Sequence, residues 1–180
     1  RRSQVVPSAL ELNAPPDGDV EIGVLLEGTP AGVRERVAAT QALLGGEVLP
    51  DPPDWWGRYP WRPGDVGIKI GVPLSGVSDV VTAARATAEL RGVPVTVRGS
   101  AGTGVLYAGL PASVPPDAVA DLLAEIRAGC EHAVVVTAPP PVRDRVDMWG
   151  PVAGLGLMRR LKQQFDPEAR FAPGRFVGGI

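Results

Sequence analysis

Residues 66–136 read VGIKIGVPLSGVSDVVTAARATAELRGVPVTVRGSAGTGVLYAGLPASVPPDAVADLLAEIRAGCEHAVVV, with short apolar runs alternating with amphipathic stretches. The runs are rich in Val, Thr and Tyr and too short for helices, so they predict strands at residues 66–72, 93–98, 105–110 and 132–137. A helix follows the first strand and another follows the third, which gives the order β-α-β-β-α-β. This order is typical of a ferredoxin-like α+β fold, an antiparallel sheet with its helices on one face.

Start and stop signals bound both helices. Ser78 is the expected N-cap of the first helix and Gly92 its expected C′ residue. Pro115 and Pro116 open the second helix, and Gly129 ends it. Each helix has an apolar side that a sheet would cover: Val80, Ala83, Ala84, Ala88 and Leu90 in the first, and Val119, Leu122, Leu123 and Ile126 in the second. Burying a Leu, Val or Ile side chain contributes roughly 1.5–3 kcal/mol, so these two sides supply much of the drive to fold.

The segment before this unit is less regular. Residues 1–19 are rich in Pro and Gly and predict an irregular lead-in, followed by a strand over residues 21–27. Thr29 is the expected cap of the next helix, which Gly45 ends. Residues 49–64, LPDPPDWWGRYPWRPG, keep neither a helix nor a strand period, so we expect an ordered aromatic loop there.

Charge divides the chain into two parts. Residues 143–180 hold seven basic and four acidic side chains, a net charge of +3, so residues 1–142 carry −5 of a chain whose net charge is −2. We expect an α+β domain over residues 1–142 and a C-terminal helix and tail over 143–180. The helix spans roughly residues 155–165, because the residue before a proline leaves the helical region. Several apolar side chains in this tail should pack on another surface: Phe165, Phe171, Phe176 and Ile180.

Composition excludes several classes of protein. One cysteine, Cys130, and one histidine, His132, cannot form a Cys/His zinc cluster or an internal disulfide. No apolar run approaches the roughly 20 residues of a membrane-spanning helix, so no transmembrane segment is expected. The acidic balance and the lack of a Lys/Arg run argue against nucleic acid. The chain begins with Arg1 and shows no signal-peptide pattern, so we expect a piece of a longer or processed chain.

Two features could belong to a binding or catalytic site, but a structural role is the more common one for each: the glycine-rich segment 99–104 and His132. The glycines of residues 99–104, GSAGTG, do not match the dinucleotide-binding fingerprint and join two predicted strands, which favours a hairpin turn. His132 opens a predicted strand; it could act as a general base, but a structural role is the commoner one for a lone histidine. No GxSxG motif accompanies it, so a serine hydrolase lacks its main signature.

The aromatic loop and the tail leave alternatives open. Trp55, Trp56 and Trp61 either roof the edge of the sheet or form the wall of a site for a planar ligand. In the basic tail, Arg175 follows a Pro-Gly turn, and Trp149 lies in the run DMWG. An arginine there either grips a carboxylate or phosphate or is an ordinary surface residue.

The C-terminal run MRRLKQQFDPEARFAPGRFVGGI, preceded by VDMWGP, resembles the end of FAD-linked oxidases of the vanillyl-alcohol oxidase type, most closely the FAD-binding subunit of bacterial glycolate oxidase. The segments SALEL, LLEGTPAGV and GTGVLYAG are also similar to the C-terminal half of that subunit. The common tail of the family reads Asn-Pro-Gly-Arg or Asn-Pro-Gly-Lys. Here Ala172 stands in place of the Asn, while Pro173, Gly174 and Arg175 are kept.

The resemblance implies that this chain is the cap, or substrate, domain and the tail that returns to an N-terminal FAD-binding domain. That domain would bind most of the FAD, with Pro173, Gly174 and Arg175 near the flavin and Trp149 and Arg98 lining the substrate pocket. The substrate implied is a small 2-hydroxy acid such as glycolate. Electrons would pass to other oxidase subunits, including an iron–sulfur subunit. The resemblance implies a cytoplasmic protein, peripheral to the inner face of the membrane through partner subunits. It assigns no catalytic base and no metal ligand, and the fragment alone is expected to be inactive.

Two other classes remain as alternatives. A non-catalytic ferredoxin-like module that binds a small molecule or a protein would fit the same architecture, because a fold does not fix a function. An RNA-binding sheet of this topology would need paired aromatics on its central strands, and Tyr107 is the only aromatic residue in the predicted strands.

Overall fold

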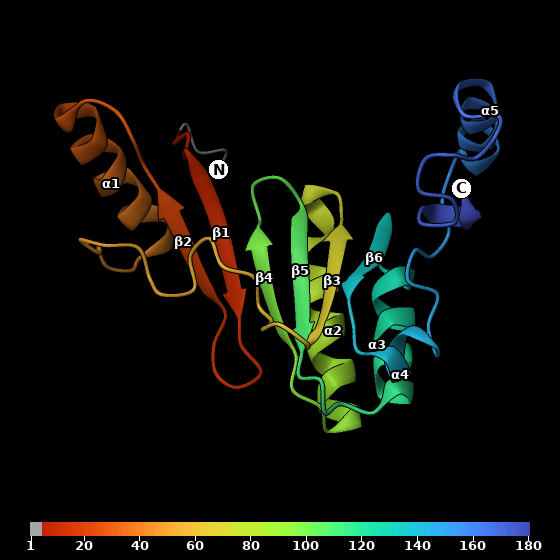
Figure 1. The fold of residues 1–180 in the computed structure, drawn as a ribbon. Helices are drawn as coiled ribbons and strands as arrows, with labels where there is room; N and C mark the ends of the chain where they lie inside the picture. Colours follow the sequence, from red (N-terminus) through yellow and green to blue (C-terminus); the bar gives the residue numbers. More distant parts are fainter. Residues whose placement is uncertain (1–4) are drawn as a thin grey trace.

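The computed structural model describes residues 5–180 and shows one six-stranded sheet in the order β2-β1-β4-β5-β3-β6 (Figure 1). Every neighbouring pair of strands is antiparallel. The strands are β1 (Ala9–Ala14), β2 (Glu21–Leu25), β3 (Val66–Gly71), β4 (Thr96–Ser100), β5 (Val105–Leu110) and β6 (His132–Thr137). The helices are α1 (Pro30–Leu44), α2 (Val77–Arg91), α3 (Pro116–Ala128), α4 (Pro140–Arg143) and α5 (Leu155–Phe165), with short 3-10 turns at Leu74–Gly76 and Val177–Gly179.

The ferredoxin-like unit is confirmed. Strands β4, β5, β3 and β6 lie side by side, and α2 and α3 pack together on one face of them (Figure 1). Val119, Leu122, Leu123 and Ile126 of α3 are all buried, as their helical spacing predicts. They meet the inward side chains of the sheet, chiefly Val66, Ile68, Ile70, Leu106 and Leu110. Side chains alternate between the two faces of a strand, so the residues between these inward ones point to the opposite face, away from α2 and α3.

The irregular lead-in predicted for residues 1–19 is wrong in part. Residues 9–14, ALELNA, form β1, which pairs with β2 on one side and β4 on the other. Leu12 and Ala14 of this strand are fully buried in the core. The prolines that flank the segment dominated its local signal, and the strand depends on pairing with β4, which lies far away in the sequence.

The predicted start of α2 was misplaced, and one residue of its predicted apolar side is exposed. The helix begins at Val77 after a 3-10 turn, and its N-cap is Gly76 rather than Ser78. Leu90, which was expected on the buried side of the helix, is 82% exposed. Val81, which was not expected there, is buried. Gly92 does end the helix, in the left-handed conformation at φ 63°.

Two helices project from opposite ends of the sheet (Figure 1). Thr29 caps α1 and Gly45 ends it as predicted, but α1 contains no buried residue. The bounds of α5 match those predicted, and it too contains no buried residue. Within residues 5–180, no helix is long and apolar enough to cross a membrane. Both projecting helices therefore offer side chains to other surfaces.

Candidate functional site

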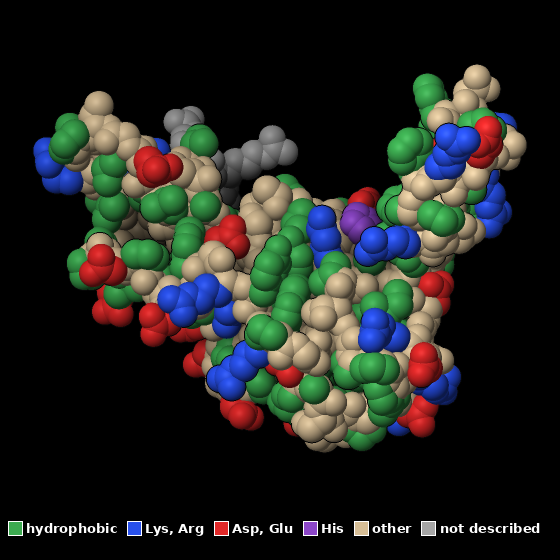
Figure 2. Space-filling view, in the orientation of Figure 1, with side chains coloured by type: hydrophobic (Ala, Val, Ile, Leu, Met, Phe, Trp, Pro, Cys, Tyr) green, Lys and Arg blue, Asp and Glu red, His purple; other side chains and the backbone are tan. Residues whose placement is uncertain are grey.

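The helix-free side of the sheet, called here the open face, carries the polar residues of the strands. Along β3, Ile68 and Ile70 point into the core, while Lys69 between them is exposed on the opposite side. Figures 1 and 2 view the sheet from this side, and hydrophobic and cationic side chains lie next to each other over its middle strands. The open face therefore presents polar side chains of the strands together with hydrophobic ones.

Strand register brings five of these residues into one line. Glu21 pairs with Asn13, Asn13 with Arg98, Arg98 with Tyr107, and Tyr107 with Lys69, so the line crosses β2, β1, β4, β5 and β3. We call it the polar row. The amide of Asn13, only 5% exposed, donates from Nδ2 to Glu21 Oε2 at 2.6 Å and accepts at Oδ1 from Arg98 Nε at 2.9 Å. At the β2 end of the row, Glu21, Asn13 and Arg98 therefore hydrogen-bond to one another.

Arg98 also fixes the aromatic loop over the open face. Its Nη1 donates to the carbonyl oxygens of Arg58 at 3.2 Å and Tyr59 at 3.4 Å. Burial lowers the pKa of Arg98, and the Glu21 carboxylate acts in the opposite direction. Its guanidinium is therefore engaged in holding the loop and Asn13, a positioning role that the sequence did not reveal.

Glycines let the loop lie directly on the strands. A Cβ at Gly109 would be 2.1 Å from the carbonyl oxygen of Pro60, and one at Gly67 would be 2.6 Å from the ring of Trp61. The indoles of Trp55 and Trp56 press in the same way on Gly23 in the edge strand β2. The three tryptophans thus divide between the two alternatives: Trp55 and Trp56 roof the sheet edge, and Trp61 reaches the centre of the open face.

A cavity of about 370 Å³ lies beside Trp61 on the open face. Its lining is Tyr59, Trp61, Lys69, Tyr107, Val136 and Thr137. Tyr59 stacks on Trp61 with ring centroids 4.6 Å apart, and Tyr107 meets Tyr59 edge-on at 5.0 Å. Burial raises the pKa of Tyr107, and the neighbouring Tyr59 adds to this, so its hydroxyl stays protonated at neutral pH.

Lys69 is the cation of this cavity, and sequence reasoning missed it. Its side chain makes no ion pair or hydrogen bond with any residue in the described part of the chain. One signal could have found it: the chain has 18 basic residues, and only two of these, Lys69 and Lys162, are lysines. A flexible ammonium group with no partner, placed among aromatic rings, suits a ligand that is both anionic and apolar.

The other motifs have structural places. Gly99 and Ser100 end β4 and residues 101–104 form the hairpin turn to β5, as predicted, and the carbonyl oxygen of Gly104 accepts from Val72 N at 2.9 Å. His132 is exposed on the open face, with its ring lying over Gly71, where a Cβ would meet it at 2.1 Å. Among residues 5–180, no group of three or more His, Cys, Asp or Glu side chains could hold a metal ion.

The remaining predicted site residues gather at the tail. Trp149 packs edge-on against Phe176, with ring centroids 5.1 Å apart. The turn at Pro173 and Gly174 follows Ala172, which has φ 43°, and Arg175 N donates to the carbonyl oxygen of Ala172 at 3.2 Å. Trp149 follows β6, whereas Arg98 lies on β4, with β5 and β3 between these strands. The structure therefore brings Trp149 to the tail turn and not to Arg98.

Asp166 organises that tail. It is 8% exposed and accepts hydrogen bonds from the backbone N–H groups of Arg170 at 2.8 Å and Phe171 at 3.0 Å, while Lys162 Nζ contacts the same carboxylate. Lys162 Nζ also donates to the carbonyl oxygen of Phe171 at 2.8 Å. These bonds tie the turn after α5 back to the helix and lower the pKa of Asp166 to about 2, with Lys162 as the main cause.

This shift sets the pH range in which the tail turn loosens. The folded pKa of Asp166 is about 2, below its ordinary value of 3.8, so its carboxylate stabilises the turn above pH 4 and stops doing so as the pH falls toward 2. The NMR amide signals of Arg170 and Phe171 should stay constant from pH 8 to 5 and shift with a midpoint near 2. The Asp166→Asn variant should lack that transition. A midpoint near 3.8 would show that the carboxylate has no partners.

Removing the guanidinium of Arg98 should detach the aromatic loop. We expect Arg98→Met to lower the free energy of unfolding by about 2 kcal/mol, because Asn13 and two loop carbonyls lose a charged donor. Urea unfolding followed by tryptophan fluorescence measures this loss. Arg62→Met is the matched control, since the Arg62 side chain makes no hydrogen bond or ion pair in the described chain. Equal stability of the two variants would contradict the anchoring role.

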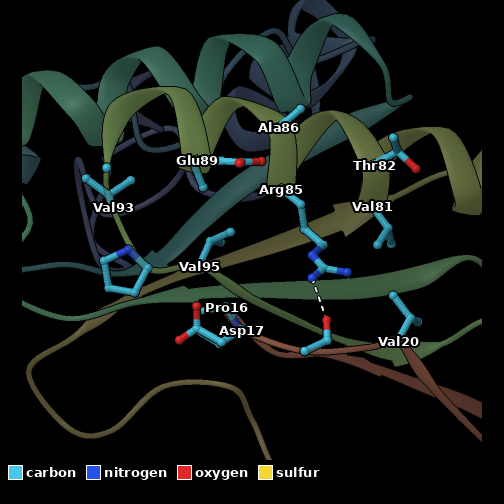
Figure 3. Close-up of a pocket in the computed structure, with 14 residues that line it drawn as sticks. Pro16, Asp17, Val20, Val81, Thr82, Arg85, Ala86, Glu89, Val93 and Val95 are labelled. Atoms are coloured by element: carbon cyan, nitrogen blue, oxygen red, sulfur yellow. Dashed lines mark hydrogen bonds between the residues drawn. The ribbon is translucent and has the colours of Figure 1, made fainter.

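A larger cavity, about 850 Å³, lies on the opposite, helix-bearing side (Figure 3). It is bounded by the turn between β1 and β2 and by the flank of α2. Arg85 points across it and donates from Nη2 to the carbonyl oxygen of Gly18 at 2.7 Å (Figure 3). Asp17 and Glu89 also line it, so its rim carries both signs of charge. Arg85 ties the turn to α2, so the guanidinium that reaches into this cavity is already paired.

Comparison with known proteins points to the tail. The family model described as FAD linked oxidases, C-terminal domain, matches residues 146–176. This span contains Trp149, α5 and the turn at Pro173, Gly174 and Arg175. No curated protein matches the chain. The tail is thus similar to part of the C-terminal domain of FAD-linked oxidases, a family that implies FAD in the complete enzyme.

Proposed function

We propose that this chain is the C-terminal portion of an FAD-dependent oxidoreductase subunit that oxidises a small 2-hydroxy acid such as glycolate. The observation that carries the proposal is the family match over residues 146–176. The glycolate oxidase resemblance of the sequence supports the substrate class. Electrons would pass to a partner subunit that carries an iron–sulfur centre, through which a cytoplasmic enzyme could contact the inner face of the membrane.

The residues of this chain fit one border of an FAD site. The Arg175 side chain has no hydrogen bond or ion pair within residues 5–180, and it follows a tight turn in which Gly174 has φ 75°. An exposed guanidinium on such a turn suits a phosphate or another anionic acceptor. The glycine-rich segment 99–104 is the end of β4 and the hairpin turn to β5, so it does not cradle a pyrophosphate at a helix N-terminus. An N-terminal FAD-binding domain would therefore hold most of the cofactor, with Pro173, Gly174 and Arg175 at its border.

The apolar surface of the tail supports a partner domain. Leu157, Leu161, Phe165, Phe171 and Phe176 are each at least half exposed. The first three recur at intervals of four along α5 and so share one side of the helix. A row of apolar side chains this large calls for a covering surface. The FAD-binding domain to which the tail returns would supply it.

The open face would contribute substrate binding. When bound, FAD would take a hydride from C2 of the hydroxy acid while the hydroxyl proton is released, which yields the 2-oxo acid. Lys69 can hold the carboxylate, and Tyr107, kept protonated, can donate a hydrogen bond. Tyr59 and Trp61 of the aromatic loop form one wall of the cavity. Trp149, at the tail, would line a different part of the pocket from these groups.

The test uses the full-length protein. Purified protein should be yellow, and a 2-hydroxy acid should bleach it under anaerobic conditions. The Arg175→Ala variant should retain less FAD, whereas Arg160→Ala, a change on the polar side of α5, should retain as much as the unmodified protein. A colourless full-length protein that binds no FAD would reject the proposal.

The second candidate is a non-catalytic ferredoxin-like module that binds a small molecule or a protein. The sheet and helices would serve it equally well. The reading frame upstream of Arg1 separates the two: a further domain of about 150–200 residues with a glycine-rich loop favours the oxidase. A nearby start codon preceded by a stop favours the module.

A further inference from the structure

We infer that the substrate carries an apolar group of about the size of a phenyl ring next to its carboxylate, and that Lys69 holds the carboxylate. The inference rests on the proposed function and narrows its substrate class. A substrate of this kind has two recognisable parts, an anion and an apolar body. The cavity on the open face offers one feature for each part.

The anion would be held by Lys69 because Lys69 is the cation among the residues that line the cavity. Arg98 donates to Asn13 and to two carbonyls of the aromatic loop. Lys162 binds Asp166 and the carbonyl oxygen of Phe171 at the far end of the chain. Lys69 alone among these three makes no hydrogen bond or ion pair with a described residue. Its ammonium group is free to pair with a carboxylate that enters the cavity.

The apolar body would be held by the three rings around Lys69. Tyr59 lies nearly parallel to Trp61, with an interplanar angle of 14°, and Tyr107 stands edge-on to both, with centroids 5.0 Å from Tyr59 and 5.8 Å from Trp61. Val136 completes the apolar lining. Tyr59 is 59% exposed and Val136 is 49% exposed, so these surfaces stay wet until a ligand covers them. Glycolate, with only hydrogens on C2, would leave them in water.

The wall is already in place before a ligand binds. Gly67 and Gly109 allow Trp61 and Pro60 to sit against the strands, and Arg98 holds the two preceding carbonyls. A preformed apolar wall gains affinity because little side-chain freedom is lost on binding. Its volume of about 370 Å³ lies within the range of small-molecule sites. We therefore expect selection by the substituent on C2 as well as by the carboxylate.

The experiment compares two substrates of the full-length holoenzyme, 3-phenyllactate and glycolate. The kcat/KM for 3-phenyllactate should exceed that for glycolate by about tenfold or more, the size of effect that extra apolar groups produce in a fitted pocket. Lys69→Met should lower both values by roughly tenfold to a hundredfold, and Lys69→Arg should recover part of the loss. Tyr59→Leu should reduce the ratio of the two values. Arg62→Met, in the same loop, should keep the ratio.

A binding measurement gives a readout that does not depend on turnover. Phenylacetate, which has no hydroxyl group to oxidise, should change the tryptophan fluorescence of the full-length protein and bind about tenfold more tightly than acetate. The Lys69→Met variant should lose this binding. If glycolate is oxidised at least as well as 3-phenyllactate, or if acetate binds as tightly as phenylacetate, the inference is wrong while the proposed function stands. If FAD is bound but no 2-hydroxy acid bleaches it, the proposed function fails instead.

Discussion

Replacement of Gly104 by alanine should destabilise the domain by about 3 kcal/mol or more. Gly104 has φ 71°, and a Cβ there would lie 2.0 Å from the carbonyl oxygen of Val72. The two residues are also joined by the hydrogen bond from Val72 N to Gly104 O. The added methyl group must therefore push apart the end of β3 and the β4–β5 turn. Urea unfolding followed by circular dichroism measures the loss.

Gly64→Ala separates this clash from the backbone effect. Gly64 also has a positive φ, 93°, but nothing lies within 4 Å of a Cβ placed there. Its replacement should cost only the conformational penalty, about 1 kcal/mol. Equal losses in the two variants would show that the contact with Val72 relaxes without cost.

The double variant Leu161→Asp with Phe165→Asp should destabilise the full-length protein much more than the isolated chain. In the isolated chain the two side chains are 50% and 79% exposed, so the free energy of unfolding should change by less than about 0.5 kcal/mol. In the full-length protein, where the FAD-binding domain would cover them, the loss should reach at least about 4 kcal/mol, together with release of FAD. Thermal unfolding and flavin absorbance measure both effects.

A matched change on the polar side of α5 controls for the added charge. Gln163 is exposed and lies two residues from both Leu161 and Phe165, on the opposite side of the helix, so Gln163→Asp adds a carboxylate away from the apolar row. This variant should leave both proteins stable. If the Leu161 and Phe165 changes destabilise the isolated chain as much as the full-length one, the apolar row already packs within this chain, and the docking proposal is lost.

The sequence pattern predicted the elements whose apolar residues and end signals lie close together in the chain. The bounds of β5, β6 and α5 agree with prediction because each has a clear period and a turn residue or proline at its end. β1 was missed because its place between β2 and β4 depends on distant partners, such as Arg98, which lies 85 residues from Asn13. Long-range pairing of this kind leaves little trace in a window of ten residues.

The candidate site was harder to predict for the same reason. Tyr107 and Lys69 become neighbours only through the register of β3 and β5. The contact of Trp61 with β3 depends on the absence of a side chain at Gly67. Arg98 was expected to line a pocket, and its hydrogen bonds to the aromatic loop could not be read from its position in a strand. The tail turn, by contrast, was visible as a continuous motif and was matched by the family model.

The two lysines of the chain meet different chemical surroundings. The Lys162 side chain is 24% exposed, and its ammonium group donates hydrogen bonds to Asp166 and to the carbonyl oxygen of Phe171. Lys69 is exposed, and its ammonium group donates no hydrogen bond to a described residue. An acylating reagent must reach the amine, and the Lys162 amine is mostly covered and hydrogen-bonded, so the reagent will modify Lys69 faster. The fold thereby singles out one side chain at the centre of the sheet for attaching a fluorophore or crosslinker.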